Sequence, residues 1–249
     1  MPVDALTTRR LRPGSSDAEE IVVATSPGSV PGVIFLHGMN STRIGAKSES
    51  LLARSQARGM GFTCFDFRAH GESGGKLELL TFSQLVEDAT AVTLEVGPAI
   101  LVGSSMGALA AAWTAAQQPE KVLALVLLSP ALGFLEDMAQ ASRSFKLHPN
   151  DEQAVEFSDE ALRDAEQFDE SALPALLTMP TCVVHGSHDT TVPCHLSRAL
   201  CEAIPHADKE LWIIEQGSHS LNEVLEPTLD RVEAFLDQRG LIPARRPTI

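Results

Sequence analysis

The segment AILVGSSMGALAAAWTAAQQP (residues 99–119) joins an apolar run to an alanine-rich run through two serines flanked by glycines. Residues 99–103 have the uniformly apolar character of a strand that is covered on both faces. The run after the serines is rich in alanine, the best helix former, and ends at Pro119. The sequence therefore predicts a buried strand, a sharp turn and a helix. Either this turn presents a serine for chemistry, or its glycines only allow the chain to reverse.

The same alternation of apolar and amphipathic segments continues along the chain. Strands are predicted at residues 20–25, 32–38, 62–67, 99–103, 122–129, 181–186 and 210–215. Helices are predicted at residues 46–58, 82–96, 106–118, 193–203 and 221–238. Strands that alternate with helices indicate an α/β fold with an open, doubly wound and mostly parallel sheet. Residues 6–12 are expected to add an antiparallel edge strand.

One interval interrupts this alternation. Between Ser129 and Pro180 the chain runs for about fifty residues without a clear strand. Part of it is acidic and helix-prone, and Ser158 followed by two acidic residues is typical of a helix start. We expect one α/β domain over residues 1–249, with residues 133–178 inserted as a small helical lid over the carboxyl ends of the strands. A surface helix without a gating role is the alternative.

Charge and composition exclude several classes of partner. Nineteen basic and 33 acidic residues give a net charge of −14, which repels nucleic acids and anionic membrane surfaces. The N-terminal residues lack the apolar stretch of a secretory signal, and the longest apolar run, at 122–135, is too short for stable membrane insertion. The four cysteines form no disulfide framework. A cytoplasmic protein is therefore expected.

The pattern Gly-x-Ser-x-Gly occurs twice, and its context separates the two copies. In residues 103–107 the central Ser105 follows a predicted strand and precedes a predicted helix. A nucleophile elbow needs this setting, because the sharp turn then holds the hydroxyl above the sheet at a helix N-terminus. In residues 71–75 the central Ser73 lies among glycines in a loop. Ser105 is therefore the predicted nucleophile.

A serine hydroxyl is a weak nucleophile and needs a base and an orienting acid. Asp189 follows the predicted strand at 181–186, and His219 follows the predicted strand at 210–215. Catalytic groups of open α/β sheets gather at the carboxyl ends of the strands, where Ser105 is also expected. His188 is the rival to His219, but no strand–loop–helix pattern favours it. The sequence thus predicts a triad of Ser105, Asp189 and His219.

An acyl-transfer site also needs donors for the oxyanion. The backbone amide of Met39 follows the strand at 32–38, and the amide of Met106 begins the helix after Ser105. These two amides are the predicted oxyanion hole. No set of histidines and acidic residues has the spacing of metal ligands, so neither a metal nor a cofactor is expected.

The chain resembles the α/β-hydrolase fold serine hydrolases from about residue 20 to residue 240. The resemblance rests on His37-Gly38, DFRAHGES (66–73), GSSMG (103–107), HGSHDTTVP (185–193) and GSH (217–219). It implies Ser105 as nucleophile, His219 as general base and then acid, and Asp189 as orienting carboxylate, in the chain order of this family. Ala69 departs from the family pattern, where glycine is often found. Residues 97–125 also resemble the mammalian mitochondrial group of acyl-glucuronide and acyl-protein thioester hydrolases.

These observations predict a serine hydrolase that cleaves carboxylic esters or thioesters of small or acyl-chain substrates through an acyl-enzyme on Ser105. A catalytically silent binding scaffold with the same fold remains an alternative. Hydrolysis of C–C bonds and peroxide chemistry use the same triad and also remain open. The acidic insertion makes a strongly anionic substrate unfavourable.

Overall fold

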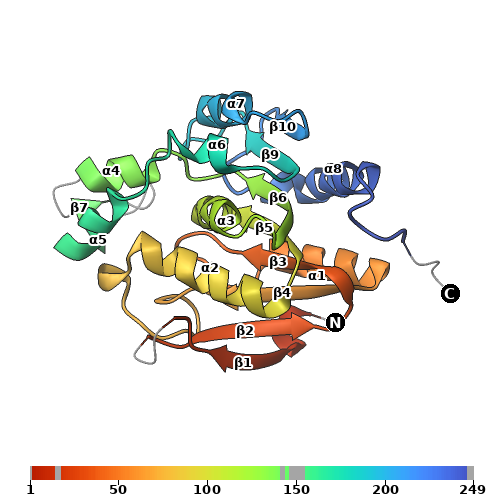
Figure 1. The fold of residues 1–249 in the computed structure, drawn as a ribbon, viewed down its shortest axis with the longest axis horizontal. Helices are drawn as coiled ribbons and strands as arrows, with labels where there is room; N and C mark the ends of the chain where they lie inside the picture. Colours follow the sequence, from red (N-terminus) through yellow and green to blue (C-terminus); the bar gives the residue numbers. More distant parts are fainter. Residues whose placement is uncertain (1, 15–17, 141–143, 146–154, 246–249) are drawn as a thin grey trace.

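The central feature of the fold is an eight-stranded sheet with helices on both faces (Figure 1). The computed structural model describes residues 2–14, 18–140, 144–145 and 155–245. In spatial order the strands are β1 (Thr7–Leu11), β2 (Ile21–Ser26), β4 (Met60–Asp66), β3 (Ser29–Leu36), β5 (Ala99–Ser104), β6 (Val122–Leu128), β9 (Thr181–Gly186) and β10 (Lys209–Ile214). Strand β2 is antiparallel to both of its neighbours, and the other pairs are parallel. The predicted fold class is confirmed.

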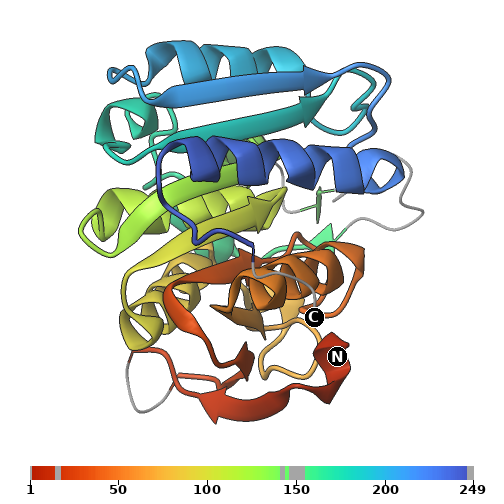
Figure 2. The ribbon, with the colours of Figure 1, turned by 90° about the vertical axis from the view of Figure 1, so that its right-hand side faces the viewer.

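Two apolar clusters hold the helices to the sheet. Helices α1 (Ala46–Arg58) and α8 (Leu225–Gln238) pack on one face, in front of the sheet in Figure 2. Helices α2 (Phe82–Val96), α3 (Met106–Gln117) and α7 (Cys194–Ala203) pack on the other. The alanines of α3 let its backbone approach β5 closely, and β5 is buried along its whole length. This packing fixes the turn between β5 and α3.

Each strand expected from the sequence is present, with ends that differ by up to three residues. Helices α1 and α2 have the predicted bounds, whereas the predicted helix at 221–238 starts with a 3-10 turn, η3 (Asn222–Val224), before α8. Two other 3-10 turns are η1 (Val3–Ala5) and η2 (Leu77–Leu79). The loops at the carboxyl ends of β3, β5, β9 and β10 therefore lie where the sequence places the functional residues.

The described part of the insertion contains α4 (Phe134–Gln140), β7 (Ser144–Phe145), β8 (Val155–Glu156), α5 (Asp159–Ala165) and α6 (Leu173–Leu176). Ser158 accepts a hydrogen bond from the amide of Ala161 and begins α5, as predicted. The ring of Phe168 packs edge-on against Phe82 of α2 and Trp113 of α3. The insertion is therefore anchored on the helical layer beside α2 (Figure 1). Its action as a lid stays a prediction, and residues 141–143 and 146–154 lie outside the described residues.

None of the helices among the described residues combines the length and the apolar character that a membrane span requires.

The Ala69 departure from the family pattern has a structural cost. Ala69 has a φ of 61°, in the left-handed region that glycine adopts without penalty. We expect Ala69→Gly to raise the free energy of unfolding by about 0.5–1 kcal/mol, because glycine removes this strain. Urea unfolding of the purified protein measures the change.

Ala53→Gly, at an exposed position inside α1, is the matched control for Ala69→Gly. There the same substitution should lower the free energy of unfolding by about 0.8–1 kcal/mol. Destabilisation at both positions would show that the alanine at 69 is not strained.

Candidate active site

Ser105 occupies the sharp turn between β5 and α3. Its φ of 56° and ψ of −121° are strained for a residue with a side chain. Its amide donates to the carbonyl oxygen of Leu128 (2.9 Å), and its own carbonyl accepts from the amide of Ala131 (3.2 Å). Leu128 is the last residue of β6, the next strand in the sheet, and Ala131 follows three residues later. The strain at Ser105 is thus maintained by bonds to the adjacent strand and the segment after it.

The glycines around Ser105 are required by close backbone contacts. A Cβ on Gly103 would lie 2.4 Å from the Cα of Ala108, and one on Gly107 would lie 2.3 Å from the carbonyl oxygen of His37. Side chains at these positions would push α3 away from the sheet. The Gly-x-Ser-x-Gly spacing is therefore a packing requirement of this turn.

The three residues of the predicted triad meet at the carboxyl edge of the sheet. Nε2 of His219 lies 2.9 Å from Oγ of Ser105, and Nδ1 lies 2.6 Å from Oδ2 of Asp189. Because a carboxylate can only accept, Nδ1 carries the proton and Nε2 presents its lone pair to the hydroxyl. The side chain of His219 is 22% exposed, so water and a substrate can reach it. This geometry suits removal of a proton from Ser105.

The side chain of Asp189 is fully buried, and its carboxylate has four N–H groups within hydrogen-bond distance. Oδ1 accepts from the amides of Thr191 and Val192, each at 2.8 Å. Oδ2 accepts from Nδ1 of His219 and lies 2.9 Å from Nε2 of His185. Burial by itself would raise the pKa of Asp189, but the hydrogen bonds from the two histidines and from Val192 hold it below its ordinary value. The carboxylate therefore remains ionised and fixed in orientation.

The other candidate base does not reach this carboxylate. His188 is exposed, and its contact with the histidine loop is a backbone hydrogen bond from its amide to the carbonyl of Gly217 (3.0 Å). Its position next to Asp189 in the chain thus does not bring the two side chains together.

The end of β3 lies directly beside Ser105. A Cβ on Gly38 would lie 3.2 Å from the Cβ of Ser105. The carbonyl of Gly38 accepts from Nδ1 of His37 (2.8 Å) and from the amide of Ser41 (3.2 Å). The Met39 amide belongs to the same peptide unit and points the opposite way, so these bonds orient it.

Within the described structure the Met39 amide donates no hydrogen bond. The amide of Met106 is the first of α3, where helical N–H groups lack an intrahelical acceptor. The two predicted oxyanion donors therefore remain available to a ligand.

His37 supports this loop as a neutral ring. Burial lowers the pKa of His37 to about 4, so its ring stays neutral and accepts from the amide of Phe67 (3.1 Å).

Ser73, the centre of the second Gly-x-Ser-x-Gly copy, is part of the scaffold. Its Oγ accepts from the amide of Val22 (2.8 Å) and donates to the carbonyl of Asp66 (2.6 Å). These bonds tie the loop after β4 to β2. In the part of the chain that the structure describes, no histidine forms a hydrogen bond with this hydroxyl.

Arg43 is a residue near the site that was not predicted from the sequence. This buried residue in the loop after β3 forms ion pairs with Asp66 and Glu72, and its amide donates to Oδ1 of Asp66 (2.7 Å). The ion pair between Arg43 and Asp66 braces the loop that carries Met39 against the end of β4. Nothing in the local pattern around Arg43 predicts it, since its partners lie more than twenty residues away.

Two family models match the chain. The model described as serine aminopeptidase, S33, matches residues 30–150. The model of the prolyl oligopeptidase family matches residues 97–238, more than half of the chain, and includes Ser105, Asp189 and His219.

The chain is also similar to individual proteins of known fold. The mitochondrial palmitoyl-protein thioesterase ABHD10 of Mus musculus is 28% identical over 211 residues, which are 79% of this chain and 71% of that protein. The structure of mouse alpha/beta hydrolase domain-containing protein 10 matches with a TM-score of 0.80 at 24% identity, over 92% of this chain and 99% of that one.

Est1E from Butyrivibrio proteoclasticus with bound ferulic acid matches with a TM-score of 0.79 at 20% identity, over 90% of this chain and 97% of that one. At these identities the two structures support the fold. Together with the family models, they show that the chain is an enzyme of the α/β-hydrolase family.

Proposed function

We propose that this enzyme hydrolyses carboxylic esters or thioesters through an acyl-enzyme on Ser105. The observation that carries the proposal is the continuous relay from Oδ2 of Asp189 through His219 to Oγ of Ser105. The similarity to a protein named as a palmitoyl-protein thioesterase supports an ester or thioester substrate.

The proposed reaction has two stages. Oγ of Ser105 attacks the carbonyl carbon while its proton passes to Nε2 of His219. The amides of Met39 and Met106 donate to the oxygen that becomes negative, and Asp189 stabilises the imidazolium. His219 then gives its proton to the departing alcohol or thiol, and the acyl group remains on Ser105. Water, deprotonated by the same nitrogen, attacks the acyl-enzyme and releases the acid.

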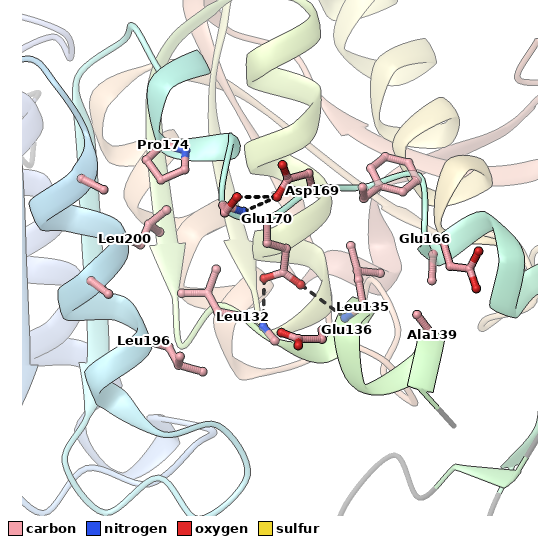
Figure 3. A pocket seen from close by; sticks show the side chains of 16 residues that line it. Leu132, Leu135, Glu136, Ala139, Glu166, Asp169, Glu170, Pro174, Leu196 and Leu200 are labelled. Carbon is pink, nitrogen blue, oxygen red and sulfur yellow. Dashed lines mark hydrogen bonds between the residues drawn. The ribbon is translucent and has the colours of Figure 1, made fainter. Parts of the chain in front are cut away.

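A cavity between the insertion and α7 is the proposed acyl site (Figure 3). It has a volume of about 520 Å³, within the range of about 300–1,000 Å³ that is usual for small-molecule sites. Leu132, Leu135, Leu196 and Leu200 line it from both sides. Leu132 follows Ala131, whose amide donates to the carbonyl of Ser105, so the cavity wall begins beside the nucleophile turn.

Acidic residues surround this cavity. Glu136, Glu166 and Asp169 are exposed at its edge (Figure 3). Glu170 accepts from the amides of Gly133 (2.8 Å) and Leu135 (3.3 Å) at the start of α4. Burial raises the pKa of Glu170, although these two hydrogen bonds oppose the shift. Carboxylates at the rim repel anions, so the acyl part of the proposed substrate is neutral or cationic.

Filling this cavity should select against long acyl chains. Ala199 is an exposed residue of α7 on the cavity wall, so Ala199→Phe adds an aromatic ring without disturbing the core. We expect KM for an octanoyl or longer ester to rise by about tenfold or more, since one ring displaces several methylenes, while hydrolysis of an acetyl ester changes little.

A panel of acetyl to palmitoyl esters and thioesters makes this comparison. Ala175→Phe, on the exposed side of α6 and outside the cavity lining, is the matched control and should leave the chain-length profile unchanged. An unchanged chain-length profile in Ala199→Phe would show that the acyl chain does not bind in this cavity.

The rate of ester hydrolysis should depend on pH through the protonation of one group, the base His219. The lowered pKa of Asp189 keeps this carboxylate ionised across the range in which histidines titrate, so acidification protonates only the base. The base must be neutral to accept the Ser105 proton, and we therefore expect kcat/KM to fall by about tenfold per pH unit on the acid side. Stopped-flow or steady-state rates on one ester from pH 4 to 8 measure this slope. A flat profile, or a slope of two protons, would contradict the assignment.

We also propose that the protein works in a reducing compartment, such as the cytosol. All four cysteines are free thiols. Burial raises the pKa of Cys64 to about 12, so that this thiol has no thiolate character at neutral pH.

The excess of acidic residues supports a small-molecule or acyl substrate and not a nucleic acid partner.

A further inference from the structure

A second histidine contacts the carboxylate of the proposed triad. His185 lies at the carboxyl end of β9 and is fully buried. Its Nε2 lies 2.9 Å from Oδ2 of Asp189, the same oxygen that accepts from Nδ1 of His219 at 2.6 Å. One carboxylate oxygen thus lies between two imidazoles.

The partners of His185 determine its tautomer. Nε2 faces two acceptors, Oδ2 of Asp189 and the carbonyl of Val192 (3.0 Å), so it must carry a proton. Nδ1 lies 2.7 Å from Oγ of Ser197, a fully buried residue of α7. In the tautomer protonated at Nε2, Nδ1 accepts from the Ser197 hydroxyl. The result is a continuous series of polar contacts from Ser197 through His185, Asp189 and His219 to Ser105.

We propose that His185 is a positioning residue for the triad: its Nε2–H, oriented by Ser197, holds the Asp189 carboxylate in place and shares its Oδ2 with His219. The inference rests on the proposed function for its catalytic meaning, but the shared oxygen can be tested without any substrate. Among the described residues, the ionisable groups in hydrogen-bond contact with His185 or Asp189 are these two residues and His219.

Sharing the oxygen has a predictable electrostatic effect. Each N–H that Oδ2 accepts draws charge from the carboxylate and weakens its attraction to an imidazolium at 219. The amides of Thr191 and Val192 would still hold Oδ1 if the His185 donor were removed. Asp189 would then stabilise protonated His219 more strongly. The midpoint of the His219 titration should move up, by about half a pH unit.

The test follows His219 by NMR titration in a Ser105→Ala background, where no turnover is needed. His185→Leu removes the donor. His185→Gln keeps an N–H near the position of Nε2 and is the conservative variant. His206→Leu is the matched control. His206 precedes the amino end of β10, whereas Asp189 follows the carboxyl end of the parallel strand β9, so the two residues lie at opposite ends of the strands. Thermal melting of each protein reports whether it is folded.

The proposal expects an upward shift in His185→Leu, recovery of most of the original midpoint in His185→Gln, and no change in His206→Leu. A folded His185→Leu protein with an unshifted midpoint, or equal shifts for Leu and Gln, would overturn it. If His185→Leu does not fold, Ser197→Ala decides, since it removes the group that orients the imidazole. An unshifted midpoint there would also overturn it. Failure to hydrolyse any ester would leave these titrations unaffected and would count only against the proposed function.

Discussion

Ser105→Ala is expected to lose at least about 10⁴ of the ester or thioester hydrolysis rate while remaining folded. The substitution removes the atom that would form the acyl-enzyme, and His219 then has no hydroxyl from which to take a proton. Alanine experiences the same backbone strain at φ 56° as serine, so the free energy of unfolding should change by less than about 1 kcal/mol. Single-turnover rates and urea unfolding measure the two quantities.

The other Gly-x-Ser-x-Gly copy provides the control. Ser73→Ala should retain most of the activity but lower the free energy of unfolding by about 1–3 kcal/mol, because the amide of Val22 and the carbonyl of Asp66 lose their partner. The two serines are thus expected to have opposite signatures, one catalytic and one structural. Equal losses of activity from both variants would contradict the assignment of Ser105.

Asp189→Asn is expected to lower kcat by about 10⁴ with little change in fold. An asparagine has one acceptor and one donor group, whereas the site presents four donors to the side chain. If its NH₂ faces His219, the imidazole must shift its proton to Nε2 and can no longer accept from Ser105. If its NH₂ faces the other way, it opposes the amides of Thr191 and Val192.

The matched control is Asp208→Asn, which removes a carboxylate from a half-exposed ion pair with Arg239. Such pairs contribute about 0–1 kcal/mol, so both activity and stability should be close to those of the parent. A kcat for Asp189→Asn within tenfold of the parent value would show that the carboxylate does not orient the base.

The order of strands and helices was predictable because the local pattern and the tertiary environment agree. Strands β5 and β6 are covered on both faces and are apolar along their length, and α1 and α2 have clear amphipathic patterns and stops. The nucleophile turn was predictable for a related reason: Gly103 and Gly107 are needed where α3 passes close to neighbouring backbone.

What the sequence could not predict depends on contacts between distant segments. The contact of Arg43 with Asp66 spans 23 residues, and the insertion is anchored by the rings of Phe168, Phe82 and Trp113 from three separate segments. His185 belongs to the segment HGSHDTTVP (185–193), which by itself does not link the imidazole to Asp189. Asp189 lies four residues later and contacts the imidazole because the turn between them folds back onto it. The sequence motif does not specify this turn.

The most direct test of the account is to treat the protein with a fluorophosphonate and to identify the labelled peptide by mass spectrometry. Only a serine activated by a neighbouring base reacts readily with such a probe. The account predicts one adduct, on Ser105, that disappears in Ser105→Ala and falls sharply in Asp189→Asn. No adduct on the folded protein, or an adduct on another serine with Ser105 unmodified, would contradict it.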